Sequence, residues 1–138
     1  MLKDLPSVED ISARLSPLFK DGSLQFIILF GSAASGHTHK GSDIDLAFRF
    51  DSPMNLLALT NKVITLLHTD KVDLVDLAHA SPILKYSVVK SGKLIYEREP
   101  GMINEFYSLA FRMYVDTKKL REARKQGIRI FLESRGLA

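Results

Sequence analysis

The chain has 138 residues, of which 46% are hydrophobic and 25% charged, a composition that is ordinary for one globular domain with a net charge of +3. It contains no cysteine, which excludes disulfides and thiolate metal sites, and no apolar run is long enough to span a membrane. The N-terminus lacks the basic-then-apolar pattern of a signal peptide, and we therefore expect a cytoplasmic protein without membrane contact.

Helix and strand signals alternate along the first half of the chain. A capping-box pattern at Ser7 predicts the start of a helix, which Pro17 is expected to shorten or kink. The nearly continuous apolar run of residues 24–30 indicates a strand that is buried on both faces. After a glycine-containing loop, the pattern predicts a second strand over residues 43–50 and a covering helix over residues 55–68.

The second half continues the alternation. A strand is predicted over residues 72–77, a helix over 81–91 and a short strand over 93–97. A long helical pattern then covers residues 102–132. We expect an α/β protein in which helices pack mainly on one face of the sheet, which leaves the other face open for a site.

Asp43 and Asp45 form the first candidate site. Residues two apart in a strand point to the same face, so the two carboxylates are expected side by side. Like charges in that position repel, and their burial is costly unless a cation lies between them. Carboxylate oxygens are typical ligands of Mg²⁺, which completes its shell with water and substrate phosphates.

Gly31 and Ser32 form the second part of the site, directly after the first strand. Glycine allows a sharp turn and a close approach to a ligand. A short helix that starts near Ser32 would point its free N–H groups at an anion, and the Ser32 hydroxyl could add a hydrogen bond. His37 and His39 follow in the loop, where no third nitrogen ligand is evident, and we interpret them as ordinary loop residues. The two parts together suit a metal–nucleotide complex.

These residues resemble a known signature. Gly31-Ser32, ten residues and then Asp43-x-Asp45 are similar to the motif of the polymerase β-type nucleotidyltransferase superfamily. The small size and the run from Ser42 to Leu46 are similar to the minimal nucleotidyltransferases (MNT), and most of all to the MNT antitoxins encoded beside HEPN ribonuclease toxins. One departure is Ser35, which stands where the family usually has arginine.

A third carboxylate is expected from the strand over residues 72–77. Asp73 and Asp76 are three apart, so they face opposite sides of a strand and only one can join Asp43 and Asp45. The resemblance implies Asp73, since the third acid of related enzymes lies early in this strand. It also implies a polymerase β-like fold with a mixed sheet and a long C-terminal helix. We expect a single domain over residues 1–138, with a catalytic core at about 7–100 and a helical extension at about 101–138.

The resemblance further implies a function. The expected reaction is Mg²⁺-dependent transfer of AMP from ATP to a tyrosine of a cognate HEPN toxin, which silences the toxin. Asp43, Asp45 and Asp73 would be the catalytic and metal-binding residues of a site with two Mg²⁺ ions, and Gly31 and Ser32 would bind the ATP phosphates. Two alternatives stay open: a non-catalytic antitoxin that acts by binding, and a nucleotidyltransferase that acts on a small molecule or on RNA.

The C-terminal extension is strongly basic. Between residues 112 and 135 eight basic residues stand against three acids; the basic ones are Arg112, Lys118, Lys119, Arg121, Arg124, Lys125, Arg129 and Arg135. The run is compatible with a solvated helix face, with a surface for an acidic protein partner or with a nucleic-acid footprint. Direct binding of nucleic acid is the least expected of the three.

Overall fold

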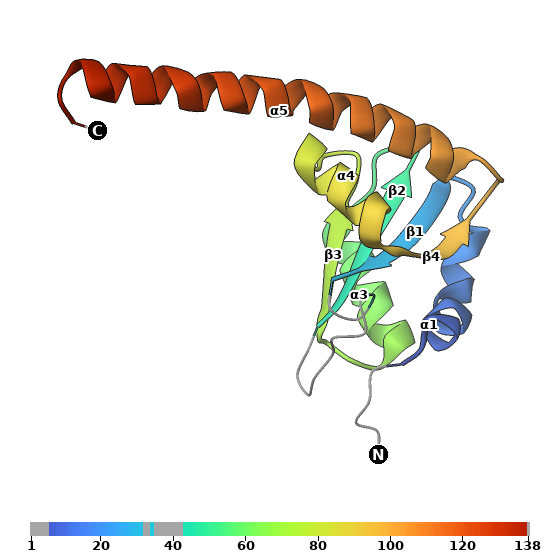
Figure 1. Cartoon of the computed structure of the whole chain (residues 1–138). Coiled ribbons are helices and arrows are strands. Elements are labelled where there is room, and N and C mark those ends of the chain that lie inside the picture. The colour runs from blue at the N-terminus through green and yellow to red at the C-terminus, as the bar shows by residue number, and fades with distance from the viewer. Residues whose placement is uncertain (1–5, 32–33, 35–42, 138) are drawn as a thin grey trace.

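A four-stranded mixed sheet lies at the centre of the molecule (Figure 1). The computed structural model describes residues 6–31, 34 and 43–137. The strand order is β3-β2-β1-β4; β1 runs antiparallel to β2 and β4, and β3 runs parallel to β2. The strands are β1 (Leu24–Phe30), β2 (Ile44–Phe50), β3 (Val72–Asp76) and β4 (Lys93–Glu97). The predicted mixed sheet is therefore confirmed.

The larger core lies on the face covered by α1 (Val8–Leu15), η1 (Ser16–Lys20) and α3 (Leu56–Leu67). Apolar positions of α1 and α3 recur at helical spacing, so each helix presents one stripe to the sheet. Alternate residues of β2 point toward them, because side chains in a strand alternate between faces. The core includes Ile11, Leu15, Leu46, Phe48, Phe50, Val63 and Leu67.

The opposite face is covered at its centre by α4 (Pro82–Ser91) and the first turns of α5 (Met102–Ser134). Phe26 and Ile28 of β1 are buried there with Val88 of α4, and the Phe26 ring meets the Phe106 ring edge-on at 5.3 Å. The expectation of an open second face is thus wrong at its centre. The second face is covered because β1 carries apolar side chains on both faces of the sheet, so that helices must bury both.

Side-chain caps determine where the helices begin. The Asp10 N–H donates to Ser7 Oγ at 3.1 Å, and the Ser7 N–H donates to Asp10 Oδ2 at 3.3 Å, which is the predicted capping box. Asn55 and Ser81 cap α3 and α4 with their side-chain oxygens. After α1 the chain tightens into η1, with Pro17 in its first turn, so the predicted shortening is confirmed.

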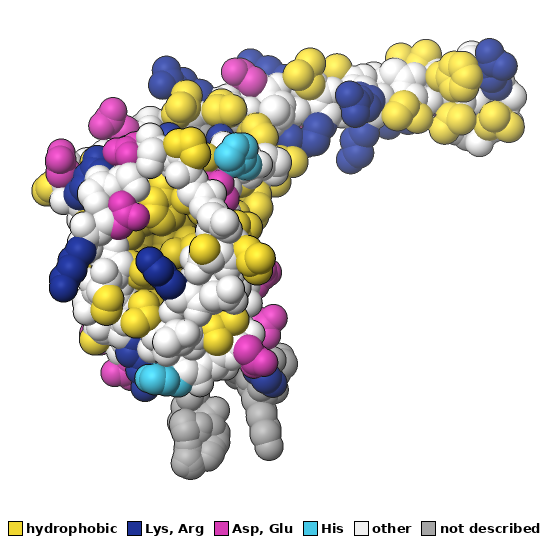
Figure 2. Space-filling model, turned by 180° about the vertical axis from the view of Figure 1, so that it is seen from behind, with side chains coloured by type: hydrophobic (Ala, Val, Ile, Leu, Met, Phe, Trp, Pro, Cys, Tyr) yellow, Lys and Arg dark blue, Asp and Glu magenta, His cyan; other side chains and the backbone are white. Residues whose placement is uncertain are grey.

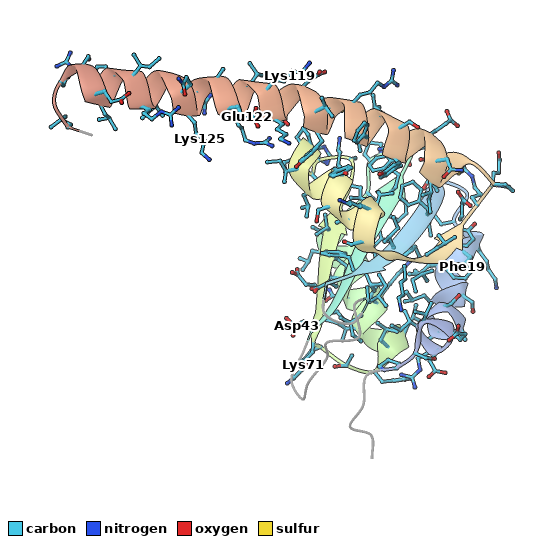
Figure 3. All side chains as sticks on the ribbon, viewed as in Figure 1. Phe19, Asp43, Lys71, Lys119, Glu122 and Lys125 are labelled. Atoms are coloured by element: carbon cyan, nitrogen blue, oxygen red, sulfur yellow. The ribbon has the colours of Figure 1, made fainter. Side chains whose placement is uncertain are left out.

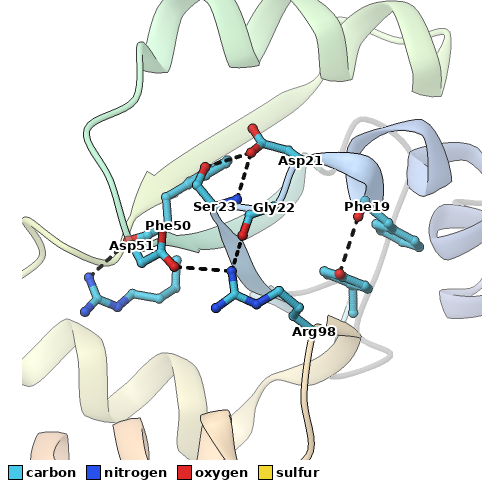
Figure 4. Close-up of polar contacts among 9 residues, drawn as sticks. Phe19, Asp21, Gly22, Ser23, Phe50, Asp51 and Arg98 are labelled. Atoms are coloured by element: carbon cyan, nitrogen blue, oxygen red, sulfur yellow. Dashed lines mark hydrogen bonds and ion pairs between the residues drawn. The ribbon is translucent and has the colours of Figure 1, made fainter.

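Arg98 joins three segments at one end of the sheet (Figure 4). Its guanidinium donates to the Gly22 carbonyl oxygen and lies 3.2 Å from the Asp51 carboxylate. Its backbone N–H donates to the Gln25 carbonyl oxygen at 2.8 Å. The start of β1, the end of β2 and the end of β4 are therefore held together at the end of the sheet away from Gly31.

Helix α5 is the predicted long C-terminal helix. Its first half is fixed to α4 by an aromatic cluster in which the Tyr86 ring stacks on Tyr114 at 4.3 Å and lies 5.7 Å from Phe111. Its second half extends past the β3 edge of the sheet (Figure 1). We call residues 118–137 the arm. Across the described ranges, no helix is long and apolar enough to cross a membrane.

We expect the close packing around Gly92 to be a sensitive test of this fold. A Cβ atom at Gly92 would lie 2.3 Å from Ile28 Cγ2 and 2.5 Å from the Val88 carbonyl oxygen. Gly92→Ala should therefore lower the free energy of unfolding by about 1–3 kcal/mol, measured by urea denaturation. Gly127→Ala is the control, because nothing lies within 4 Å of that Cβ and alanine favours a helix. Equal stability of the two variants would contradict the packing described here.

Candidate active site

Three carboxylates lie at one end of the sheet. In the parallel register of β2 and β3, Asp45 is paired directly with Asp73, so both side chains share one face. Asp43 precedes Asp45 by two residues, immediately before β2. Alternation therefore places Asp43 on the same face. Asp43 and Asp73 are exposed, whereas Asp45 is half-buried.

Gly31 comes to this cluster from the end of β1. Phe30 is paired with Asp45 in the antiparallel register, and the next residue turns with a φ of +74°. A Cβ atom on Gly31 would lie 2.1 Å from Asp45 Oδ2 and 3.0 Å from Asp45 Cγ. Position 31 therefore requires glycine for two reasons: the backbone there has a positive φ, and the Asp45 carboxylate leaves no room for a side chain.

The carboxylates influence one another. Burial raises the pKa of Asp45 above its ordinary value of 3.8, and the negative charges of Asp73 and Asp43 raise this pKa further. Both effects disfavour the ionised form, because a charge loses water on burial and like charges repel. A cation bound to these oxygens would relieve both costs.

Asp76 belongs to a different environment. It pairs with Phe48, whose side chain points to the α1 and α3 face, so Asp76 faces away from Asp45. Its carboxylate accepts the Ala78 N–H at 3.0 Å and lies 2.8 Å from His79 Nδ1. The structure thus places Asp73, and not Asp76, beside Asp45.

Of the predicted site residues, Ser32 lies outside the described residues, as does most of the short helix predicted after it. The same holds for Ser35 and for His37 and His39, which we interpret as ordinary loop residues. Lys71 was not singled out from the sequence. Its carbonyl oxygen accepts the Ile44 N–H at 2.9 Å, so this bond lies at the start of the hydrogen-bond ladder that joins β2, with Asp45, to β3, with Asp73. Its position two residues before Asp73 was the available signal.

The donor set fits Mg²⁺. Asp43, Asp45 and Asp73 offer hard carboxylate oxygens, which this ion prefers. The charges of Asp73 and Asp43 add to the effect of burial in raising the pKa of Asp45. Within the ranges that the structure describes, no three acidic or histidine side chains are gathered closely enough to enclose a metal ion.

The electrostatic cost at Asp45 predicts a pH-dependent stability in metal-free solution. The pKa of Asp45 is higher in the folded chain than the ordinary 3.8, so its ionised form destabilises the fold, and this cost disappears as falling pH protonates the carboxyl. Asp45→Asn should therefore unfold at higher urea concentration than wild type at pH 7. The difference should narrow as the pH falls toward about 4. A variant that is less stable at pH 7, or a difference that does not change with pH, would contradict this account.

Comparison with known proteins agrees with this geometry. The profile described as "Polymerase beta, Nucleotidyltransferase" matches residues 14–101. The protein adenylyltransferase MntA of Aphanizomenon flos-aquae is 26% identical over 145 residues, which cover 96% of this chain and 95% of that protein. The match spans the sheet, the three carboxylates and, with MntA, the C-terminal helix as well.

Two solved structures share the fold. A toxin–antitoxin crystal structure with AMP-PNP has a TM-score of 0.74 at 29% identity and covers 90% of this chain and 99% of that chain. A complex of the tri-AMPylated Shewanella oneidensis HEPN toxin with an MNT antitoxin has a TM-score of 0.70 at 28% identity, covering 88% and 98%. The predicted polymerase β-like fold is confirmed. Because the profile covers more than half of its length, the chain belongs to the polymerase β nucleotidyltransferase family and is a nucleotidyltransferase.

Proposed function

We propose that this chain is an antitoxin-type protein adenylyltransferase, which transfers AMP from ATP to a tyrosine of a cognate HEPN ribonuclease toxin and thereby neutralises it. The observation that carries the proposal is the register that pairs Asp45 with Asp73 while Gly31 packs against Asp45. Its similarity to MntA and to the antitoxin in complex with the AMPylated HEPN toxin supports the choice of nucleotide and acceptor. The cytoplasm, where ATP is available, is the proposed compartment.

Each residue has a proposed role at this site. Two Mg²⁺ ions would be held by Asp43, Asp45 and Asp73. The ions would stabilise negative charge on the attacking and leaving oxygens. Gly31, with Ser32 beside it in the sequence, would bind the β- and γ-phosphates, because the glycine lets the backbone approach an anion closely. Asp73 lies on the edge strand of the sheet and would be nearest to the acceptor.

The proposed reaction is a single displacement at the α-phosphorus of ATP. Asp73 accepts the proton of the tyrosine hydroxyl, and the tyrosine oxygen attacks the α-phosphorus of ATP. The bond from that phosphorus to the oxygen bridging the β-phosphate breaks, and pyrophosphate leaves with the electron pair. The product is an AMP group joined to the tyrosine oxygen by a phosphodiester bond. Positioning and charge stabilisation supply most of the rate in transfers of this kind.

We expect replacement of the paired carboxylates to abolish this reaction. Asp43→Asn with Asp45→Asn removes the negative charges that hold the metal, so AMP incorporation into the toxin should fall by about 1,000-fold or more. The measurement is intact-mass analysis of the HEPN toxin after incubation with ATP, Mg²⁺ and the variant. Asp76→Asn is the matched control, because it is an aspartate of the neighbouring strand that faces away from the cluster.

The same variants separate the enzyme from a non-catalytic antitoxin. Neutralisation of the toxin in cells by the Asp43/Asp45 variant would show that binding alone is sufficient. The departure at Ser35 from the usual arginine is the feature that favours this second reading. AMP incorporation at equal rates into unrelated proteins would instead contradict a dedicated toxin as acceptor.

The arm offers a surface for the toxin. We propose that the core at residues 7–100 performs the chemistry and that the extension at 101–138 grips the partner. Large apolar side chains of the arm are exposed, including Leu120 (70%) and Phe131 (52%). Figure 2 shows basic side chains along the arm and hydrophobic ones gathered toward its end. This combination suits a protein surface that is apolar at its centre and acidic at its rim.

The position of the arm supports the same partner. It extends past the β3 edge, the edge that also carries Asp73, so arm and edge form two sides of an L (Figure 1). Lys125 points from the arm toward the side where Asp43 lies (Figure 3). A toxin seated in the angle could touch the arm and present its tyrosine at the sheet edge. We therefore assign the basic run to a protein partner and not to nucleic acid.

Charge reversal on the arm should weaken toxin binding. Arg124→Glu with Lys125→Glu reverses two exposed charges and should raise the dissociation constant by about tenfold at low salt. The effect should shrink as salt screens the charges, which calorimetry at two ionic strengths would show. Lys20→Glu with Lys62→Glu is the control, since it reverses two exposed charges on η1 and α3. Equal weakening by both pairs would mean that only net charge matters.

A further inference from the structure

Lys71 lies at the end of the sheet that carries the carboxylates. The Ile44 N–H donates to the Lys71 carbonyl oxygen at 2.9 Å, immediately before the Ile44–Val72 pair. Lys71 itself precedes β3, and its own N–H donates to Thr69 Oγ1 at 3.1 Å. It lies two residues before Asp73, and Figure 3 shows Asp43 and Lys71 at the same corner of the molecule.

The strand order places Lys71 on one particular side of the site. Gly31, at the end of β1, packs against Asp45 from one side. β3 pairs with β2 on the other side and forms the edge of the sheet. The carboxylates of β2 thus lie between Gly31, where the triphosphate is proposed to bind, and Lys71. An incoming macromolecule reaches the edge strand more easily than the centre, so Lys71 lies on the side from which the acceptor would approach.

The ammonium group of Lys71 is available for that acceptor. The residue is exposed, and among the described side chains the ion pairs join Arg98 to Asp51 and His79 to Asp76. No carboxylate of the described chain therefore lies within ion-pairing distance of Lys71. A lysine is a compact cation with three donors on a flexible stem, which suits contact with a single oxygen atom.

A tyrosine acceptor would be helped by such a cation. Its phenol has a pKa near 10, so the attacking oxygen must gain negative charge. The Mg²⁺ ions proposed above would stabilise part of that charge, and a positive side chain on the acceptor side would add to this stabilisation. Lys71 takes no part in the proton transfer, and the atoms exchanged are those of the transfer described above.

We propose that Lys71 is a further catalytic residue, which binds the oxygen of the acceptor tyrosine and stabilises its negative charge during attack on the α-phosphorus. The proposal rests on the proposed function and adds to it the group that receives the acceptor. It assigns Lys71 to the acceptor and not to ATP.

The test separates these two assignments. Lys71→Met should lower kcat for AMP transfer to the HEPN toxin by about 100-fold, with a smaller change in KM for the toxin. Its affinity for AMP-PNP with Mg²⁺, measured by calorimetry, should stay within about twofold of wild type. Lys71→Arg should restore part of the rate, since it returns a cation. Lys62→Met is the matched control, because Lys62 is also an exposed lysine but lies on α3.

Each outcome has a distinct meaning. Weaker AMP-PNP binding by Lys71→Met would place Lys71 on the triphosphate and overturn the acceptor assignment. An unchanged kcat, with wild type active, would overturn any catalytic role of Lys71. Absence of transfer by the wild-type chain would overturn the proposed function itself, independently of Lys71. Retained AMP-PNP binding also shows that the variant is folded.

Discussion

Repulsion among three carboxylates is the constraint around which this end of the molecule is built. Asp45 is half-buried, paired with Asp73 and two residues from Asp43. Burial and the charges of Asp73 and Asp43 together raise its pKa. A fold keeps such an arrangement only if other interactions hold the strands in register. Here the two buried cores of the sheet provide that support, because a shift of one residue would turn every apolar side chain of β2 to the wrong face.

The same sheet separates the positions proposed for the two reactants. Its centre brings Gly31 against Asp45, where only backbone can approach closely, and this is the side proposed for phosphate. Asp73 lies on the edge strand β3, and both Asp73 and Lys71 are exposed. The arm extends past that edge at the far end of the domain (Figure 1). The proposed nucleotide and the proposed protein acceptor would thus approach the carboxylates from different sides.

Local patterns in the sequence were sufficient for most of the fold. Three features depend only on neighbours along the chain, and each was predicted: the Ser7 capping box, the apolar run of β1 and the long helical pattern of α5. The cover over the second face was missed, because periodicity shows that β1 is buried on both sides but not which helix buries it. The contacts by which Arg98 joins β1, β2 and β4 were also missed, since its partners Gly22 and Asp51 are distant in sequence.

The sequence by itself determined which groups can take part in the chemistry: the spacing of Asp43 and Asp45 places both on one face, and the three-residue spacing of Asp73 and Asp76 allows only one of them to join. The tertiary structure decided which one, through the parallel register that pairs Asp45 with Asp73. It also decided that Gly31 must be glycine on steric grounds and that the Lys71 carbonyl oxygen accepts the N–H of Ile44, the residue after Asp43. Pairing between strands is a contact between distant segments, and only the packed sheet fixes which residues it brings together.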